Sequence, residues 1–154
     1  MASRRQFLIT TTATTMALTA LGTSTALAEK TGVYTRWGVA IRGTDPVAYF
    51  TENRPVEGSK KFTHTHDGAE FRFASAENLA LFKANPEKYA PQYGGFCAWA
   101  VSLGYTAPTV PEAFTIVDGK LYLNYSLGVR SQWEADRDNR IILGDNNWPA
   151  VLSR

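Results

Sequence analysis

The chain contains two histidines and one cysteine, His64, His66 and Cys97. Imidazole and thiolate groups are suitable ligands for copper and zinc, and copper has the higher intrinsic affinity for such a set. Because His64 and His66 are two positions apart, a strand would project both side chains to the same side, about 6.5 to 7 Å apart. That spacing permits two imidazoles to bind one ion. The pattern therefore favours a copper or zinc site, with Cys97 as the third candidate ligand.

Each of these residues also has an ordinary structural interpretation. His64 can pack beside Phe71 as a half-buried strand residue, and His66 can lie near an exposed turn. Cys97 lies between Phe96 and Trp99, where a small buried thiol is common and unreactive. Both interpretations stay open from the sequence alone.

A catalytic site is not expected. The sequence contains no Gly-x-Ser-x-Gly, His-Glu-x-x-His or phosphate-loop motif. A Cys97–His64 dyad would need the two side chains within hydrogen-bond reach, which their spacing does not promise. Asp45 offers a carboxylate, although Asp-Pro is also a frequent turn former. We therefore predict that the protein is not an enzyme.

Local signals predict the elements that would position these residues. Asp67-Gly68 separates two alternating runs, 62–66 and 69–73, and favours a hairpin with a two-residue turn. The expected cross-strand pairs are His66–Ala69, His64–Phe71 and Phe62–Phe73. Asp118-Gly119 repeats the same signature and predicts a second hairpin between 114 and 123.

Short helices are expected between and after the hairpins. Ser75 is a good cap for a helix that Asn85-Pro86 ends, and Asn85 can cap the next turn. Ser126 can cap a last amphipathic helix through Ala135, followed by a polar stretch and a tail. No strand-helix-strand unit is long enough for a parallel crossover. The prediction is a small single α+β domain of two β-hairpins with short helices.

The first 28 residues are typical of an export signal. Arg4-Arg5 precedes an uncharged stretch that ends in small residues at Ala28, as in twin-arginine signal peptides. A membrane anchor is the alternative interpretation, but it would need about 20 strongly apolar residues, and this stretch contains many threonines. We expect a signal peptide at 1–28, a flexible lead-in at 29–43, extended near its end, and the domain at 44–154. The protein would then be periplasmic or otherwise exported, with no membrane span after cleavage.

Composition and charge restrict the partners. The chain has 154 residues, 44% hydrophobic and 12% aromatic, which indicates one globular domain rather than a disordered chain. Removing Arg4 and Arg5 leaves 14 basic residues against 14 acidic ones. With no run of basic residues longer than Lys60-Lys61, nucleic acid and polybasic membrane contacts are not expected. A single cysteine excludes an internal disulfide.

Five motifs in order along the chain resemble those of exported YHS-domain proteins. They are DPVAYF (45–50), FRFAS (71–75), NPEKY (85–89), PQYGGFCA (91–98) and DGKLYLNY (118–125). The resemblance implies a YHS-like fold over roughly 44–148. It also implies metal binding, in the forms of the domain that carry cysteines after the Asp-Pro-Val segment and after the aromatic strand end. This chain has Ala48 and Ala74 at those positions.

Two functions follow as expectations. The first is binding of a transition metal, copper or otherwise zinc, for sequestration or handover, with Cys97, His64 and His66 as ligands. The alternative is a binding module without metal, which would hold a small ligand or a partner in an aromatic-lined groove near Gly94-Gly95. Tyrosines and tryptophans available to such a groove, most of them expected in the core, are Tyr49, Tyr89, Tyr93, Tyr122, Tyr125, Trp99 and Trp133.

Overall fold

The computed structural model describes residues 31–154. The expected signal peptide at 1–28 lies outside the described residues. Within the described part, none of the helices has both the length and the apolar character needed to cross a membrane.

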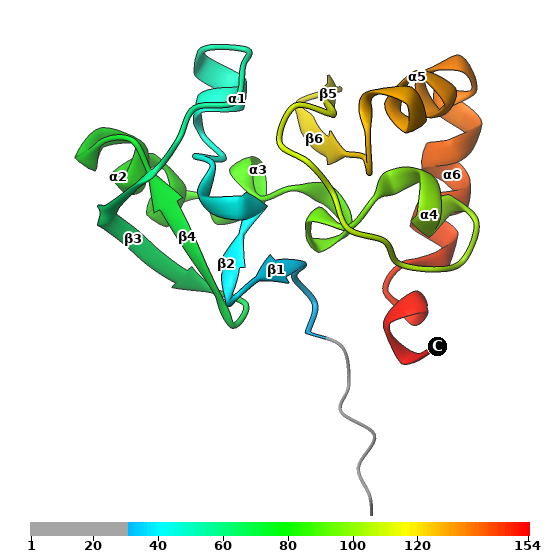
Figure 1. Cartoon of the computed structure of the whole chain (residues 1–154), viewed down its shortest axis with the longest axis horizontal. Coiled ribbons are helices and arrows are strands. Elements are labelled where there is room, and N and C mark those ends of the chain that lie inside the picture. The colour runs from blue at the N-terminus through cyan, green and yellow to red at the C-terminus, as the bar shows by residue number, and fades with distance from the viewer. Residues whose placement is uncertain (1–30) are drawn as a thin grey trace, which may run out of the picture.

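A four-stranded sheet forms one side of the molecule (Figure 1). Its strands are β1 (Thr35–Arg36), β2 (Val39–Ala40), β3 (Ser59–His66) and β4 (Ala69–Phe73), in the order β1-β2-β4-β3. β2 pairs with β4 in parallel, through Val39 and Glu70. This parallel pair was not expected from the sequence, because a two-residue strand is too short to leave a sequence signal; it is not a strand-helix-strand unit, since β3 lies between β2 and β4 in the chain.

The β3–β4 hairpin confirms the prediction made from its turn. Asp67 and Gly68 have φ values of 48° and 77°, the left-handed pair that a two-residue turn requires. His64 pairs with Phe71 and His66 with Ala69, as expected. The predicted Phe62–Phe73 pair is wrong, because a bulge between Ser59 and Thr63 shifts the register and brings Ser59 opposite Phe73.

Three short helices border this sheet. They are α1 (Ala48–Thr51), α2 (Ala76–Ala84) and α3 (Pro86–Tyr89). The caps predicted at Ser75 and Asn85 are confirmed, as is the one predicted at Ser126, whose hydroxyl accepts from the Val129 N–H at 3.2 Å. The Ser75 hydroxyl accepts a hydrogen bond from the Asn78 N–H at 3.1 Å, and the Asn85 side chain accepts one from the Lys88 N–H at 3.2 Å.

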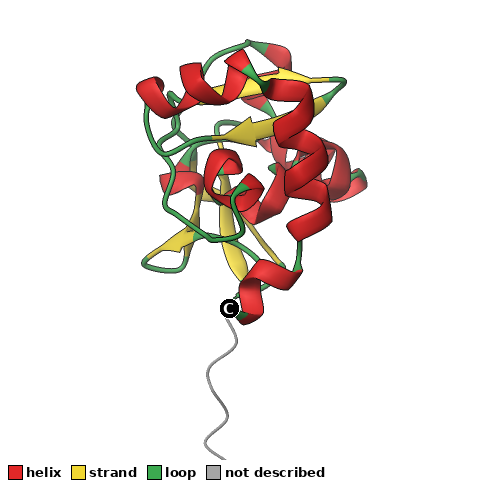
Figure 2. Ribbon diagram, turned by 90° about the vertical axis from the view of Figure 1, so that its right-hand side faces the viewer, coloured by secondary structure: helices red, strands yellow, loops and turns green. Residues whose placement is uncertain are grey.

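The other side of the molecule contains the second hairpin and most of the longer helices. The hairpin joins β5 (Phe114–Val117) to β6 (Lys120–Leu123) as predicted. The helices are α4 (Ala98–Ser102), α5 (Leu127–Ala135) and α6 (Arg137–Asn147), and they face the reader in Figure 2.

Helix α6 was not predicted. The sequence from 137 to 147 was expected to be an irregular polar stretch, and α5 the last helix. The helix is held by packing that its composition does not reveal. Ile141 packs into a buried cluster, and Gly144 is buried at a place where a Cβ would lie 2.5 Å from the Tyr93 hydroxyl oxygen. Glycine therefore lets the Tyr93 ring lie directly on the helix.

Alternate residues of β6 join two buried clusters into one domain. Leu121 and Leu123 face the cluster that covers the four-stranded sheet, together with Phe73 and Phe82. Tyr122, between them, points into the cluster around Trp133 beneath the helices. The molecule is thus a small α+β domain, as predicted.

Residues 33–43, part of the expected lead-in, pack against the domain. Val33, Ala40 and Ile41 are buried, and the Tyr34 N–H donates a hydrogen bond to the Gly94 carbonyl oxygen at 2.9 Å. The segment from Val33 to Gly43 therefore belongs to the fold, because it supplies strands β1 and β2 and its first residues pack on the turn at Gly94.

Candidate ligand-binding cleft

The two histidines occupy one face of β3, as their spacing predicted. Both are partly buried, and both rings contact Phe82 edge-on, with centroid separations of 6.1 Å for His64 and 5.6 Å for His66. His66 Nε2 also lies 3.4 Å from Asp67 Oδ2. The histidines therefore border the apolar cluster, and His66 has a carboxylate beside it.

Cys97 lies in the other half of the domain. It precedes α4, is 1% exposed, and its Sγ is 3.5 Å from the Asn124 side-chain oxygen, to which the thiol donates. Burial raises the pKa of the Cys97 thiol, so the thiolate needed for metal binding is disfavoured. It borders a separate apolar hollow beside Trp99 and Tyr125.

The predicted three-ligand site is not assembled. Among residues 31–154, no three histidine, cysteine, aspartate or glutamate side chains are grouped closely enough to hold one metal ion. The described structure therefore does not bring His64, His66 and Cys97 together at a common site. The histidines extend from the sheet, whereas the cysteine begins a helix that packs in the second half.

Asp45 has a structural role. Its buried carboxylate accepts hydrogen bonds from the backbone N–H groups of Val47 and Ala74, both at 2.8 Å, and from the Asn78 side-chain amide at 2.8 Å. A weaker contact of 3.4 Å reaches the Ala48 N–H. The carboxylate thus ties the start of α1 to the end of β4 and to α2, and it does not face the cleft described next.

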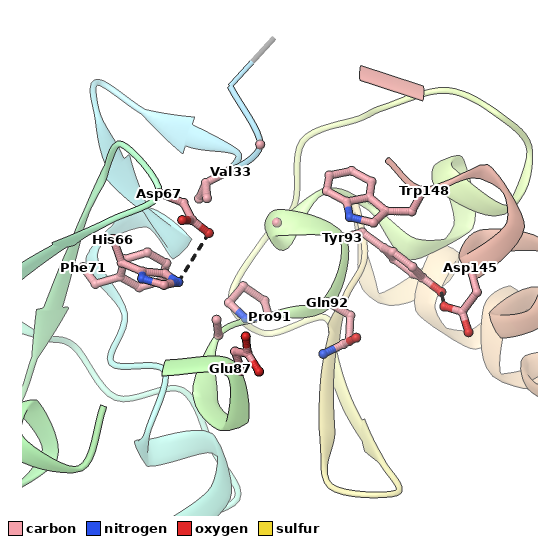
Figure 3. A pocket seen from close by; sticks show the side chains of 13 residues that line it. Val33, His66, Asp67, Phe71, Glu87, Pro91, Gln92, Tyr93, Asp145 and Trp148 are labelled. Atoms are coloured by element: carbon pink, nitrogen blue, oxygen red, sulfur yellow. Dashed lines mark hydrogen bonds and ion pairs between the residues drawn. The ribbon is translucent and has the colours of Figure 1, made fainter. Parts of the chain in front are cut away.

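A cleft of about 370 Å³ opens between the two halves of the domain (Figure 3). Its walls come from the β3–β4 turn, the segment at Gly32 and Val33, the end of α3 with the following turn at 92–94, and the C-terminal end of α6. Its aromatic lining consists of Phe71, Tyr93 and Trp148, and its acidic lining of Asp67, Glu87 and Asp145. His66 and Gln92 add further polar groups.

The turn at Tyr93 and Gly94 shapes this cleft. Both residues are left-handed, with φ values of 55° and 60°. A Cβ on Gly94 would lie 1.8 Å from the carbonyl oxygen of Gly32, so only glycine permits the N-terminal segment to cross here. The crossing forms one rim of the cleft.

The lining of the cleft is acidic. The described lining includes three carboxylates and no lysine or arginine. One carboxylate is fixed in place, because the Tyr93 hydroxyl donates to Asp145 Oδ1 at 2.8 Å. Burial raises the pKa of Tyr93 well above its usual range, and the Asp145 partner raises it further. The phenol stays a hydrogen-bond donor, and Asp145 can still accept from a ligand.

One protein-family model matches part of the chain. The YHS domain model matches residues 47–93. This stretch is a YHS domain. No curated protein and no solved structure matches the chain. YHS domains are associated with metal binding, and this one ends at Tyr93, within the wall of the cleft.

The cleft lies at the edge of the YHS domain. The domain contributes His66, Asp67 and Glu87, whereas Asp145 and Trp148 come from the chain that follows it. The expected aromatic groove near Gly94-Gly95 has its counterpart here. Asp145 and Trp148 were missed because α6 was not predicted.

Proposed function

We propose that this protein is an exported, non-catalytic binding protein that holds a small organic cation in the cleft. One observation carries the proposal: a concave site of about 370 Å³ combines three carboxylates with aromatic walls and no basic side chain in its described lining. Small-ligand sites typically have such a mixed lining and a volume in this range. Export is supported by the sequence of the first 28 residues.

The arrangement favours an extended organic cation over a single metal ion. The carboxylates of Asp67, Glu87 and Asp145 do not converge on one point, since no metal-holding group of three occurs within residues 31–154. Separated carboxylates suit ammonium groups spaced along a chain. The Tyr93 and Trp148 rings supply faces that attract cations.

Calorimetric titration with putrescine tests this proposal, and 1,4-butanediol is the uncharged control of equal length. We expect putrescine to bind and butanediol not to bind. Asp145→Asn should weaken putrescine binding roughly tenfold or more, because a hydrogen bond to a charged group contributes about 1.5–3 kcal/mol. Asp138→Asn, on the same helix but with its side chain 83% exposed, is the matched control. Equal binding of the diol, or equal loss in both variants, would exclude this ligand class.

Copper binding is a second candidate function. It is supported by the YHS match and by His66, whose imidazole lies 3.4 Å from Asp67 at the rim of the cleft, with His64 on the same face. Copper would be held by His66 and Asp67 as a pair rather than by a group of three residues, and without Cys97. Copper titration should then weaken in His66→Ala and remain unchanged in Cys97→Ala. Unchanged affinity in His66→Ala would exclude this arrangement.

A further inference from the structure

A second hollow, of about 400 Å³, has four cations among its six lining residues. We call it the basic groove. It is formed by Arg36, Trp37, Val39, Arg42, Lys60 and Arg72. These residues come from β1, β2 and the turn between them, from the 3-10 helix Ile41–Gly43, and from strands β3 and β4, which lie together at one side of Figure 1. No carboxylate contributes to its described lining.

The basic groups of this groove are largely available. Within residues 31–154, Arg36, Arg42 and Lys60 form no ion pair, and all three are exposed. Arg72 Nε alone has a carboxylate partner, Glu70 Oε1 at 2.7 Å. Four cations around one hollow repel one another, and a single carboxylate at the edge offsets only part of that repulsion.

Trp37 adds a flat apolar surface to these charges. It is 88% exposed at the tip of the β1–β2 turn, and the Arg36 guanidinium lies 4.6 Å from the centre of its ring. An indole this exposed contributes little to the core. A guanidinium stacked on it is held in place, ready to donate hydrogen bonds outward.

We propose that the basic groove binds a phosphate-type oxyanion group. Arginine forks match the geometry of phosphate oxygens, and an anion would offset the repulsion among the four cations. The sequence gives no sign of this groove, because each segment supplies only one or two basic residues and the basic and acidic residues of the described chain balance. The fold gathers them in space.

Binding of inorganic pyrophosphate, followed by calorimetry at low ionic strength, tests this proposal. We expect binding that weakens as salt is added, because the interaction is electrostatic. The variant Arg42→Gln/Lys60→Gln should bind at least tenfold more weakly. Arg54→Gln/Arg137→Gln removes the same net charge outside the groove and should leave the affinity unchanged. Since all four side chains are exposed, circular dichroism should show an intact fold in both variants.

Vesicles distinguish the source of the phosphate group. Retention on phosphatidic acid vesicles but not on phosphatidylcholine, lost in Arg42→Gln/Lys60→Gln, would identify a lipid headgroup. Pyrophosphate binding without vesicle retention would identify a soluble ligand. Absence of both, or equal weakening in the two double variants, would overturn the proposal. None of these outcomes depends on the cleft beside Tyr93, whose lining contains none of these residues.

Discussion

Replacing Asp45 tests how the start of the YHS domain is held to its central part. The carboxylate is 0% exposed and accepts three hydrogen bonds of 2.8 Å, from Val47, Ala74 and Asn78. Asp45→Ala leaves these donors without their partner, at a cost of about 1–3 kcal/mol for each donor that stays buried. Asp45→Ala also removes the free-energy cost of burying the carboxylate, and this offsets part of the loss. We therefore expect a loss of about 3–5 kcal/mol, the range found when buried charged networks are broken.

Urea unfolding followed by circular dichroism measures this loss. With a slope of about 1–3 kcal/mol per molar urea, the midpoint should fall by roughly 2 M. Asp45→Asn keeps the shape and one acceptor oxygen, so its stability should lie between those of Asp45→Ala and the parent. Glu57→Ala, an exposed carboxylate, should change stability by no more than about 0.5 kcal/mol. A loss below about 1 kcal/mol for Asp45→Ala would refute this account of the carboxylate.

Three further predictions concern the cleft rim, the thiol and the buried tyrosines. Gly94→Ala should weaken putrescine binding, because the new Cβ would lie 1.8 Å from the Gly32 carbonyl oxygen and push the N-terminal segment away from the cleft. Limited proteolysis should then cut that segment faster than in the parent. Cys97 should react with Ellman's reagent far more slowly in the native protein than in urea, since it is 1% exposed and burial raises its pKa; equal rates would contradict its burial. Burial raises the pKa of Tyr122 from 10.0 to about 12 and also raises that of Tyr93, so the folded state keeps protons that the unfolded state loses. The two tyrosines should therefore leave the free energy of unfolding unchanged below about pH 10 and lower it between pH 10 and 12. The midpoint of urea unfolding measures this change, and a midpoint that rises with pH in this window would contradict the prediction.

The features predicted from the sequence are those that neighbouring residues determine. Asp67-Gly68 can adopt the left-handed turn by itself, and Ser75 caps α2 through an N–H three residues away. Both therefore appear in the sequence as local patterns. The predicted pairing of Phe62 with Phe73 was wrong because the strand contains a bulge, and a bulge depends on how the sheet packs.

The features that were missed depend on distant contacts. Helix α6 is polar by composition, and its position depends on Gly144 accommodating the Tyr93 ring. The cleft requires this helix, because Asp145 and Trp148 line it. Cys97 could not be separated from the histidines by sequence, since only the fold places it at the start of α4 in the other half of the domain.

The central claim is that the cleft between the two halves binds an organic cation. Titration of the ¹⁵N-labelled protein with putrescine, followed by amide chemical shifts, tests it most directly. We predict shifts concentrated at Asp67, Glu87, Gly94 and Asp145, no shifts at the β5–β6 turn around Asp118, and none with 1,4-butanediol. Shifts centred on another surface, or the same shifts with the diol, would contradict the claim.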